Sequence, residues 1–458
     1  MKHKYRGVVD SPLPPGAYDS RKTALVDDFR SRDGNARIGK STSSNLFRYS
    51  PREKKHSRSI ALDDFNHVLS LDEQAQTVEV EGLITYEKLV AFTLSRGFLP
   101  TVSPELKHIT VGGAIVGIGI ESTCFRHGFV HDGLLEADVF LPDGRIVTCT
   151  PTNEHADLFA GLPNSYGTLG YILRVKLRLI PALDNVQIDN RRFYSIETFF
   201  EAMQQASHQS EYDFVEGIFY SDDELYLTTG RFSREATQIE DIYRDHIYYK
   251  LLRADTSFYL DSFDYIFRYD PDWFWNIPEG GLYDLLRKYG PLSIRNSGFY
   301  NRYVDFTDRV KQRAGLSDGR DKREPLIQDW QLPWSLAPEF VRYALANVDI
   351  QGQPWTGAPI HAIGSPTNYP IPANSLYFNM GCYCGTDRPR SDIDFYYTRI
   401  LDSKCFELGG IKMLYSTTFL EPEEFSRLYN GSAYAELKKR YDPAGLSPTL
   451  YEKAVMNR

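Results

Sequence analysis

Cysteine is scarce in this chain, with five residues among 458, and the five are widely scattered. Secreted disulfide scaffolds pair many cysteines, so this usage favours a reducing compartment and a cytoplasmic location. No stretch approaches the roughly 18 apolar residues that a spanning helix needs, and the N-terminus lacks an apolar signal-peptide core. Cys382 and Cys384 lack the spacing of a thioredoxin-like or zinc-binding motif, so no metal site is expected. Peripheral attachment to the inner face of a membrane stays open.

An excess of basic residues is also lacking, because 61 acidic against 52 basic side chains give a net charge of -9. Without a sustained basic stripe, the chain is not expected to bind nucleic acid. Residues 1–60 nevertheless carry 14 basic and 6 acidic side chains, which makes this segment a candidate anion site. Within it, Lys54, Lys55 and Arg58 suit the phosphates of a bound ligand or anionic lipid headgroups.

Changes in composition and hydrophobic pattern along the chain predict three regions. Residues 1–35 are polar and contain proline, which indicates a leader with a short helix from about Arg21 to Arg30. Residues 36–181 contain short β-like runs, and residues 182–458 are richer in aromatic side chains and mix strands with helices. The fold class expected is α+β, with a first domain over 36–181 and a second over 182–458.

Local signals place several elements. Thr85 is the expected N-cap of a helix that Gly97 stops, and Pro142-Asp-Gly144 is a strong hairpin turn. In the second region, strands are predicted at Val215–Tyr220, Glu224–Thr229 and Leu376–Gly381, and helices at Ile196–Gln209 and Glu421–Tyr429.

The most informative stretch is Thr110–Ser122, which has four glycines within eight residues. Consecutive N–H groups in such a turn can form a nest for a phosphate. Gly117-x-Gly119-x-x-Ser122 imitates the dinucleotide fingerprint, with Glu136 near the distance of a ribose-binding acid. Residues 123–133 show no helical stripe, however, and that fingerprint must open a helix. A glycine-rich turn with no ligand remains the alternative.

A second segment, Gly39–Asn45, combines a glycine, a lysine, four hydroxyl side chains and an amide. Such a loop can surround a pyrophosphate with donors while Lys40 supplies charge, although the spacing of a Walker A loop is absent. A polar surface turn is the plainer interpretation of this segment alone.

The order of these segments carries a resemblance over nearly the whole chain. The phosphate loop, Thr110-Val-Gly-Gly113, Arg126-His-Gly128, Pro142-Asp-Gly144 and Gly167-Thr-Leu-Gly170 resemble the FAD-binding domain of the vanillyl-alcohol-oxidase, or PCMH-type, flavoprotein superfamily. Motifs shared along the chain look more narrowly like the Δ24-sterol reductase (diminuto/seladin) group and its soluble bacterial relatives, which include reductases of 10-methylene fatty acyl chains. These shared motifs are Val111–Ser122, Phe214–Gly217, Met413–Tyr415 and Glu423–Phe425.

The resemblance implies a PCMH-type two-subdomain FAD-binding domain followed by an α+β substrate or cap domain, whose C-terminal segment returns to the flavin. The implied FAD-binding residues are Gly39, Lys40, Ser41, Thr42, Ser43, Ser44, Asn45, Thr110, Val111, Gly112, Gly113, Gly117, Gly119, Glu121, Ser122, Gly128, Gly167, Gly170 and Ile172. Some members attach the flavin through a His or Cys in the first loop or near the second segment. The first loop has neither here, so FAD is expected to be non-covalent. Cys124 and His127 are the positions to check.

The implied activity is reduction of a C=C bond in a lipid, a sterol side chain or a methylene-branched acyl chain, with NADPH as electron donor. Such a reaction needs a hydride from the flavin and a proton from a positioned acid. The catalytic candidates are Tyr415, Glu216 and Lys412, the last as a partner for the reduced flavin. Glu216 is expected either to face inward, where burial would raise its pKa, or to lie on a solvated strand face. Tyr415 can equally be a core tyrosine.

Two other functions stay open at this point. One is an alcohol or sugar oxidase or dehydrogenase of the same superfamily, and the other is a lipid-binding protein that retains flavin without catalysis. The aromatic cluster Phe258–Trp275 is either ordinary core or the wall of a lipid channel.

Overall fold

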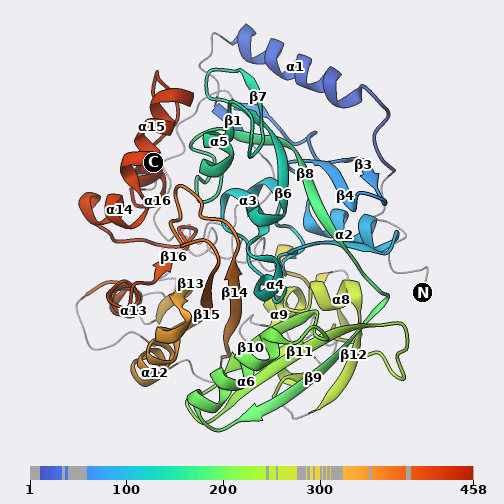
Figure 1. Ribbon diagram of the computed structural model, residues 1–458, viewed down its shortest axis with the longest axis vertical. Helices are drawn as coiled ribbons and strands as arrows, with labels where there is room; N and C mark the ends of the chain where they lie inside the picture. The colour runs from blue at the N-terminus through green and yellow to red at the C-terminus, as the bar shows by residue number, and fades with distance from the viewer. Residues whose placement is uncertain are drawn as a thin grey trace.

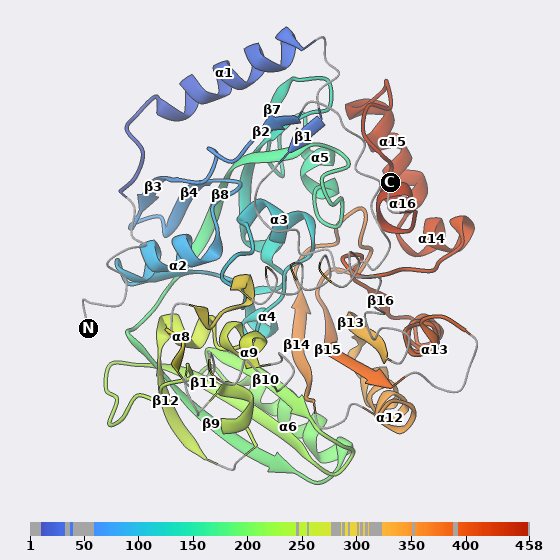
Figure 2. The ribbon, with the colours of Figure 1, turned by 180° about the vertical axis from the view of Figure 1, so that it is seen from behind.

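The computed structural model describes residues 11–32, 37–39, 59–243, 247–253, 256–275, 285, 289–291, 294–299, 302, 306, 310, 323–349, 353–387 and 393–456. Two large sheets organise these residues, one of six strands and one of eight. Figure 1 shows the first sheet in the upper part of the molecule and the second in the lower part, and Figure 2 shows the same division from behind. The α+β fold class is confirmed.

A helix of the leader lies across the outside of the first sheet, along the top of Figure 1. This helix, α1 (Ala17–Ser31), is longer at its N-terminal end than the predicted Arg21–Arg30. It buries Leu25 and Phe29, and the ring of Phe29 meets that of Phe140 edge-on at 5.4 Å.

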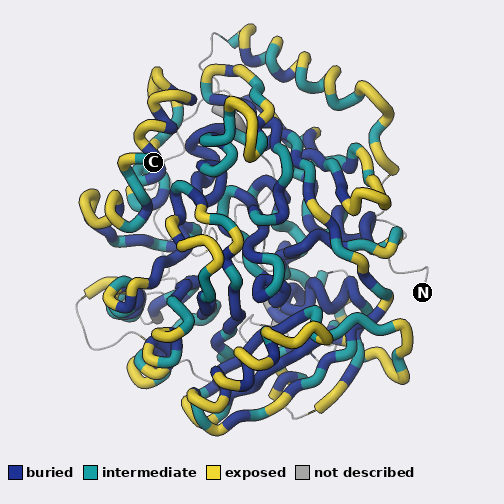
Figure 3. The backbone as a smooth tube through the Cα atoms, viewed as in Figure 1, coloured by how far each residue is buried: buried dark blue, intermediate teal, exposed yellow. Residues whose placement is uncertain are grey.

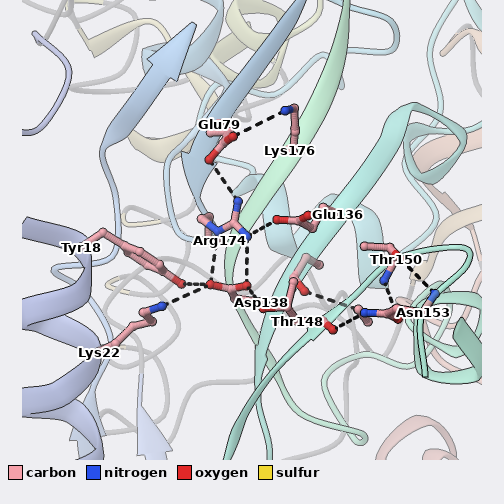
Figure 4. Close-up of polar contacts among 12 residues, drawn as sticks. Tyr18, Lys22, Glu79, Glu136, Asp138, Thr148, Thr150, Asn153, Arg174 and Lys176 are labelled. Carbon is pink, nitrogen blue, oxygen red and sulfur yellow. Dashed lines mark hydrogen bonds and ion pairs between the residues drawn. The ribbon is translucent and has the colours of Figure 1, made fainter. Parts of the chain in front are cut away.

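Polar contacts fix α1 on the sheet as well (Figure 4). The hydroxyl of Tyr18 donates to Asp138 Oδ2 at 2.8 Å, and Arg174 Nη2 donates to Asp138 Oδ1 at 3.0 Å. Arg174 also pairs with Glu136, so the acid considered as a ribose ligand is occupied by an ion pair within the sheet.

The six-stranded sheet has the order β3-β4-β8-β6-β7, and β5 pairs with β8. Its elements are β3 (Val68–Asp72), β4 (Thr77–Glu81), α2 (Tyr86–Leu94), β5 (Phe98–Pro100), α3 (Val111–Val116), α4 (Cys124–His127), η1 (Val130–Gly133), β6 (Leu134–Phe140), β7 (Ile146–Cys149), α5 (Ala156–Gly161) and β8 (Tyr171–Pro181). A two-stranded parallel pair, β1 (Arg37–Gly39) and β2 (Ser59–Ala61), lies outside it.

Two local predictions in this region are confirmed. Thr85 caps α2, since its hydroxyl accepts from the Lys88 amide at 3.4 Å, and Gly97 beyond the helix has a φ of 79°. The turn at Pro142-Asp-Gly144 joins β6 and β7 as an antiparallel hairpin, with Gly144 at a φ of 87°. Gly97 and Gly144 have positive φ angles that suit a residue without Cβ, and Thr85 supplies a capping hydroxyl. These requirements are why the sequence signal was clear.

The eight-stranded sheet has the order β12-β9-β11-β10-β14-β15-β13-β16. Its strands are β9 (Asn185–Phe193), β10 (Phe214–Phe219), β11 (Leu225–Ser233), β12 (Ser257–Asp261), β13 (Arg323–Pro333), β14 (Trp355–Ala362), β15 (Ser375–Asp387) and β16 (Ile411–Lys412). The accompanying helices are α6 (Ile196–His208), α7 (Tyr248–Leu251), α8 (Ser262–Ile266), α9 (Asp270–Trp275), η3 (Trp334–Leu336), α12 (Ala337–Asn347) and α13 (Tyr396–Glu407). The strands predicted at 215–220, 224–229 and 376–381 correspond to β10, β11 and β15.

The two faces of this sheet have different environments. Alternate residues such as Val215, Phe219, Trp330 and Leu332 join the core formed with α6, α12 and α13, which cover the outer face. The residues between them point to the inner face, toward the first sheet and its helices. Figure 3 shows buried backbone running continuously through this junction.

The chain ends in three helices, α14 (Pro422–Leu428), α15 (Gly431–Tyr441) and α16 (Leu450–Ala454), which return to the first region. The hydroxyl of Tyr434 donates to Thr168 Oγ1 at 2.8 Å, and Lys438 Nζ donates to the Thr168 carbonyl at 3.1 Å. We call these contacts of α15 with the loop at residues 164–170 the C-terminal clasp. Among the described residues, no helix combines the length and apolar character needed to cross a membrane.

Candidate functional site

The candidate site lies where the glycine-rich segment of the first region meets the inner face of the eight-stranded sheet. Figure 1 shows α4 beside β14 and β10 at this junction. The Val215 amide donates to the Ser122 carbonyl at 2.9 Å, so β10 is joined directly to the end of the glycine-rich segment. Tyr166 makes a second connection, because its hydroxyl accepts from the Leu414 amide at 3.1 Å.

A buried guanidinium forms the first polar cluster of the junction. Arg268 Nη2 lies 2.6 Å from Glu121 Oε1 and 2.5 Å from Glu216 Oε2. The rings of Tyr265, Tyr269 and Tyr248 surround the guanidinium carbon, with centroids 4.5, 4.9 and 5.6 Å away. We call these residues the Arg268 cluster; it connects the glycine-rich segment to β10.

Glu216 therefore faces inward, which was one of its two predicted positions. Its carboxylate accepts from Tyr248 at 2.7 Å as well as from Arg268. Glu216 thus serves to hold Arg268 in place as an acceptor of its hydrogen bonds.

A second cluster centres on Asp329 of β13, which sequence reasoning did not single out. Asp329 Oδ2 accepts from Tyr415 at 2.7 Å and from Tyr383 at 2.8 Å, and Oδ1 accepts from Asn379 at 2.8 Å. Three donors from two segments, β15 and the stretch that follows β16, thus converge on one buried carboxyl. We call these four residues the Asp329 cluster.

The environment of Tyr415 makes it a weak acid. Burial, and then the nearby charge of Asp329, raises its pKa well above the ordinary range. Its proton is already engaged in the hydrogen bond to Asp329. A general acid works best with a pKa near the working pH, so this geometry counts against Tyr415 as the proton donor.

Lys412 lies on the other face of the sheet. It pairs with Trp330 in the β13–β16 register, and its ammonium donates to Asp402 of α13 at 2.6 Å and to the Thr417 carbonyl at 3.0 Å. The side chain is fully buried on the helix-covered face. This position counts against a role for Lys412 beside the flavin.

The glycine-rich stretch is not the open turn that its composition predicted, because Val111–Val116 forms the short helix α3. The Val111 amide donates to the Ile84 carbonyl, the Gly112 amide to the Gly82 carbonyl, and the Gly113 amide to Thr110 Oγ1. The first three amides of α3 are therefore committed to protein acceptors, which leaves a nest at Thr110–Ser122 to the amides further along the segment. A Cβ on Gly112 would lie 2.9 Å from the Gly82 carbonyl and 3.2 Å from Ile172 Cβ, so this glycine serves close packing.

Other predicted cofactor residues occupy tight positions around α3. Gly119 faces Pro104 and Val130, where an added Cβ would lie 3.2 Å and 2.6 Å from their side chains. Positive φ angles of 70°, 77° and 146° at Gly128, Gly167 and Gly170 restrict those positions to glycine. Ile172 lies on β8, and Gly39 ends β1. Lys40, Ser41, Thr42, Ser43, Ser44 and Asn45 lie outside the described residues.

Orphaned polar atoms test whether a ligand fits here. Among the described residues, Ser103 Oγ, Glu121 Oε2, Thr123 Oγ1 and both ring nitrogens of His131 are buried without a hydrogen-bond partner. Buried polar groups are normally paired, so these atoms indicate a missing polar partner. The hydroxyl and N–H groups of FAD fit such acceptors and donors.

Neither position considered for covalent attachment is exposed as a reactive group. Cys124 is buried, its sulfur accepts from the Glu121 amide at 3.2 Å, and burial raises the pKa of its thiol. Burial, and then the charge of Arg126, lowers the pKa of His127 to about 4.

Comparisons with known proteins identify the first region. A family model described as an FAD binding domain matches residues 40–150. The Delta(24)-sterol reductase of Homo sapiens is 28% identical over 407 residues, which are 84% of this chain and 75% of that protein. The Delta(24)-sterol reductase of Arabidopsis thaliana is 22% identical over 441 residues, 87% of this chain and 77% of that protein.

A dehydrogenase appears among the relatives too. Cytokinin dehydrogenase 7 of Oryza sativa subsp. japonica is 29% identical over 414 residues, 81% of this chain and 72% of that protein. The prediction of FAD as cofactor is confirmed by the matching family model. The chain is therefore an FAD-dependent oxidoreductase that carries an FAD binding domain and is homologous to the Delta(24)-sterol reductases.

Proposed function

We propose that this protein reduces a carbon–carbon double bond of a lipid, in a sterol side chain or a methylene-branched fatty acyl chain. The observation that carries the proposal is the similarity to Delta(24)-sterol reductases from animals and plants over more than four fifths of the chain. Because a match of this length must include most of the eight-stranded sheet, it includes most of the part of the chain that would face the substrate.

In this proposal FAD is held non-covalently at the junction of the two sheets and supplies a hydride when it is reduced. Three segments would hold it: residues 39–45, Gly117–Ser122, and the loop that contains Gly167 and Gly170. The unpartnered Glu121 Oε2 and Ser103 Oγ support this location. Glu121 belongs to the glycine-rich segment, and Ser103 precedes Pro104, which packs against Gly119. The Arg268 cluster would fix Glu121 in position for that contact.

The protein's own residues would also shape the substrate side of the junction. Ile360, Ile411 and Met413 of the second region join the core that contains Ile115 and Ile118 of the first. Such apolar surroundings suit a lipid chain and exclude water from the hydride transfer. The Asp329 cluster would provide the polar groups at one end of the apolar surroundings of the substrate.

NADPH is proposed as the electron donor, and its phosphates suit the basic surplus of residues 1–60. The same surplus suits an anionic membrane surface, from which a lipid substrate would be taken. Peripheral attachment to the inner face of a membrane is therefore part of the proposal.

Anaerobic mixing tests the function. We expect NADPH to bleach the visible absorbance of the flavin, and a Δ24-sterol or a 10-methylene acyl chain to restore it. The similarity to a cytokinin dehydrogenase supports the rival activity of an oxidase or dehydrogenase, in which an alcohol or a sugar bleaches the flavin and an external acceptor restores it. If no donor reduces the flavin, the protein is a non-catalytic lipid-binding flavoprotein instead.

A further inference from the structure

Two thiols lie in contact on one strand of the eight-stranded sheet. Cys382 Sγ and Cys384 Sγ are 3.2 Å apart on β15, the strand between β14 and β13 (Figure 1). Side chains two residues apart on a strand point to the same face. For this pair it is the helix-covered face, because Cys382 belongs to the core on that face and Cys384 packs against it. None of the functions considered above uses these thiols.

The two thiols differ in their access to solvent. Cys382 is 0% exposed, whereas Cys384 is partly exposed. Burial also raises the pKa of the Cys382 thiol well above its ordinary value. A reagent from solvent therefore meets Cys384 first, and Cys382 lies within reach to react second. A partly exposed thiol that touches a second thiol has the arrangement of an attacking cysteine beside its resolving cysteine.

Unpaired polar groups flank the buried thiol. Cys382 pairs with Gln328 of β13 and with Trp355 of β14 in the registers of the sheet, so the three side chains share one face. Among the described residues, both amide atoms of Gln328 and Trp355 Nε1 are buried without a hydrogen-bond partner, and the two side chains belong to residues that are 1% and 0% exposed. Buried polar groups normally have a partner. The N–H groups of Gln328 and Trp355 suit a thiolate at Cys382, the form in which a cysteine attacks.

Tyr383 lies between the two cysteines and connects them to the other face of the sheet. Its side chain points away from theirs. Its hydroxyl donates to Asp329 Oδ2 at 2.8 Å and accepts from the Tyr415 hydroxyl at 3.3 Å. The Asp329 cluster is therefore held in part by the residue that a bond between the two sulfurs would enclose.

Closing such a bond would shorten the strand. Residues two apart on an extended strand are roughly 6.5 Å apart at Cα, whereas bridged cysteines are most often about 5.5–6 Å apart. The sulfurs would also move from 3.2 Å to about 2 Å. The backbone at Tyr383 has to bend to allow this, which displaces its hydroxyl from Asp329. A bridge that bends its own strand is also easy to reduce.

We propose that Cys382 and Cys384 form a reversible redox site that takes a low-molecular-weight disulfide as its oxidant and closes into an intrastrand disulfide. The Cys384 sulfur attacks the reagent, whose S–S bond breaks, so that a mixed disulfide forms and one reagent thiol leaves. Cys382 then attacks the Cys384 sulfur, and the second reagent thiol leaves. The cysteines lose two electrons and two protons, and both pass to the reagent, whose two sulfurs end as S–H groups. This site goes beyond the proposed function and does not rest on it.

Peptide mapping of the native, flavin-loaded protein tests the site. Glutathione disulfide is the probe, and iodoacetamide then alkylates the remaining thiols in denaturant. Trypsin releases residues 343–390, which contain Cys382 and Cys384 and no other cysteine. We expect this peptide to be two hydrogen atoms lighter, with neither cysteine alkylated, and dithiothreitol to restore both thiols. Retention of two alkylatable cysteines, or closure only in denaturant, would overturn the proposal.

Single substitutions separate the two steps. Cys382→Ser should stop at the mixed disulfide, so its peptide gains one glutathione on Cys384, whereas Cys384→Ser should stay unmodified because Cys382 is buried. Cys405→Ser removes another buried cysteine of the same core and is the matched control, which should close the bridge as the wild type does. Equal modification of Cys382→Ser and Cys384→Ser would contradict the proposed order. If a variant does not fold, the wild-type peptide still decides whether the bridge forms.

Near-ultraviolet circular dichroism tests the connection to the other face. Oxidation of the wild-type protein should change the tyrosine band, and the change should be absent in Cys384→Ser and smaller in Tyr383→Phe. An unchanged band in the bridged wild-type protein would refute a displacement of Tyr383. A flavin that no alkene reoxidises would refute the proposed function instead, and the thiol chemistry would be the same.

Discussion

Arg268 Nη2 lies 2.6 Å from Glu121 Oε1, and this contact joins the glycine-rich segment to a helix-rich part of the second region, 147 residues further along the chain. The guanidinium is 1% exposed, and its carboxylate partners are 2% and 7% exposed. The two regions are therefore connected by charge as well as by apolar contact. An interface of this kind is sensitive to the loss of its central cation.

Arg268→Ala should be strongly destabilising, because it leaves two buried carboxylates facing each other without a counter-charge. Removing one partner of a buried ion pair costs about 3–5 kcal/mol. Urea unfolding of the purified protein measures the change. Arg342→Ala is the matched control, since Arg342 and its partner Glu197 are 51% and 59% exposed, and it should cost under about 1 kcal/mol. Similar losses in both variants would contradict the buried pairing.

Asp138→Asn should lower the free energy of unfolding at neutral pH and lower it much less in acid. Burial alone would raise the pKa of Asp138, but hydrogen bonds from Arg174, Thr148 and Tyr18 outweigh it and hold that pKa below its ordinary value. The unfolded chain then binds a proton at this position more readily than the folded one. The stability that Asp138 contributes is complete above the unfolded pKa of about 4 and is lost as the pH falls through the lowered folded pKa.

Unfolding by urea at about pH 7 and about pH 3 tests this expectation. We expect a loss of about 2 kcal/mol at the higher pH, the size of a hydrogen bond to a charged group. Asp143→Asn, in the exposed hairpin turn, is the control and should show neither the loss nor the pH dependence. A loss of equal size at both pH values would show that the charge of Asp138 is not its source.

Gly112→Ala should disturb the packing of α3 rather than a phosphate contact. The new methyl group would lie 2.9 Å from a backbone carbonyl that cannot rotate away. Overpacking of this kind costs about 1–3 kcal/mol. Gly364→Ala is a suitable control, because its methyl group would meet only the end of the Asp132 side chain, at 3.1 Å. Thermal unfolding of the flavin-free proteins separates the two, and equal midpoints would refute the packing role.

Tyr434→Phe should loosen the C-terminal clasp and weaken flavin retention. The hydroxyl of Tyr434 donates to Thr168 and accepts from the Leu450 amide at 3.0 Å. Each lost hydrogen bond is worth about 1 kcal/mol, so the dissociation constant for FAD should rise several-fold if the 164–170 loop contacts the cofactor. Fluorescence of released flavin on dilution measures this, with Tyr194→Phe, 71% exposed, as the control. Unchanged retention would remove the loop from the cofactor site.

Much of the fold could be predicted from local chemistry. Thr85, Gly97 and Pro142-Asp-Gly144 mark elements through capping and turn geometry, which depend on a few neighbouring residues. The glycines of α3 misled the prediction because composition cannot distinguish a loop that needs freedom from a helix that needs close approach. The Thr110 cap, whose hydroxyl accepts from the Gly113 amide, was the signal available for a helix.

The candidate site was harder to predict because it is built from distant segments. Asp329 is a single acid in a strand, and only the pairing of β13 with β15 brings Tyr383 and Asn379 beside it. Lys412 and Tyr415 are three residues apart in the sequence, yet β16 directs Lys412 to the opposite face of the sheet. The face occupied by Glu216 depended on Arg268, 52 residues away.

The C-terminal clasp has a consequence for biosynthesis. Thr168 leaves the ribosome well before Tyr434 and Lys438, which are 266 and 270 residues further along the chain. During translation, the 164–170 loop therefore lacks its contacts with α15 until the whole eight-stranded sheet has been synthesised. Throughout that interval the first region of the nascent chain lacks these contacts, so chaperones and proteases meet it in a less constrained form than in the finished protein.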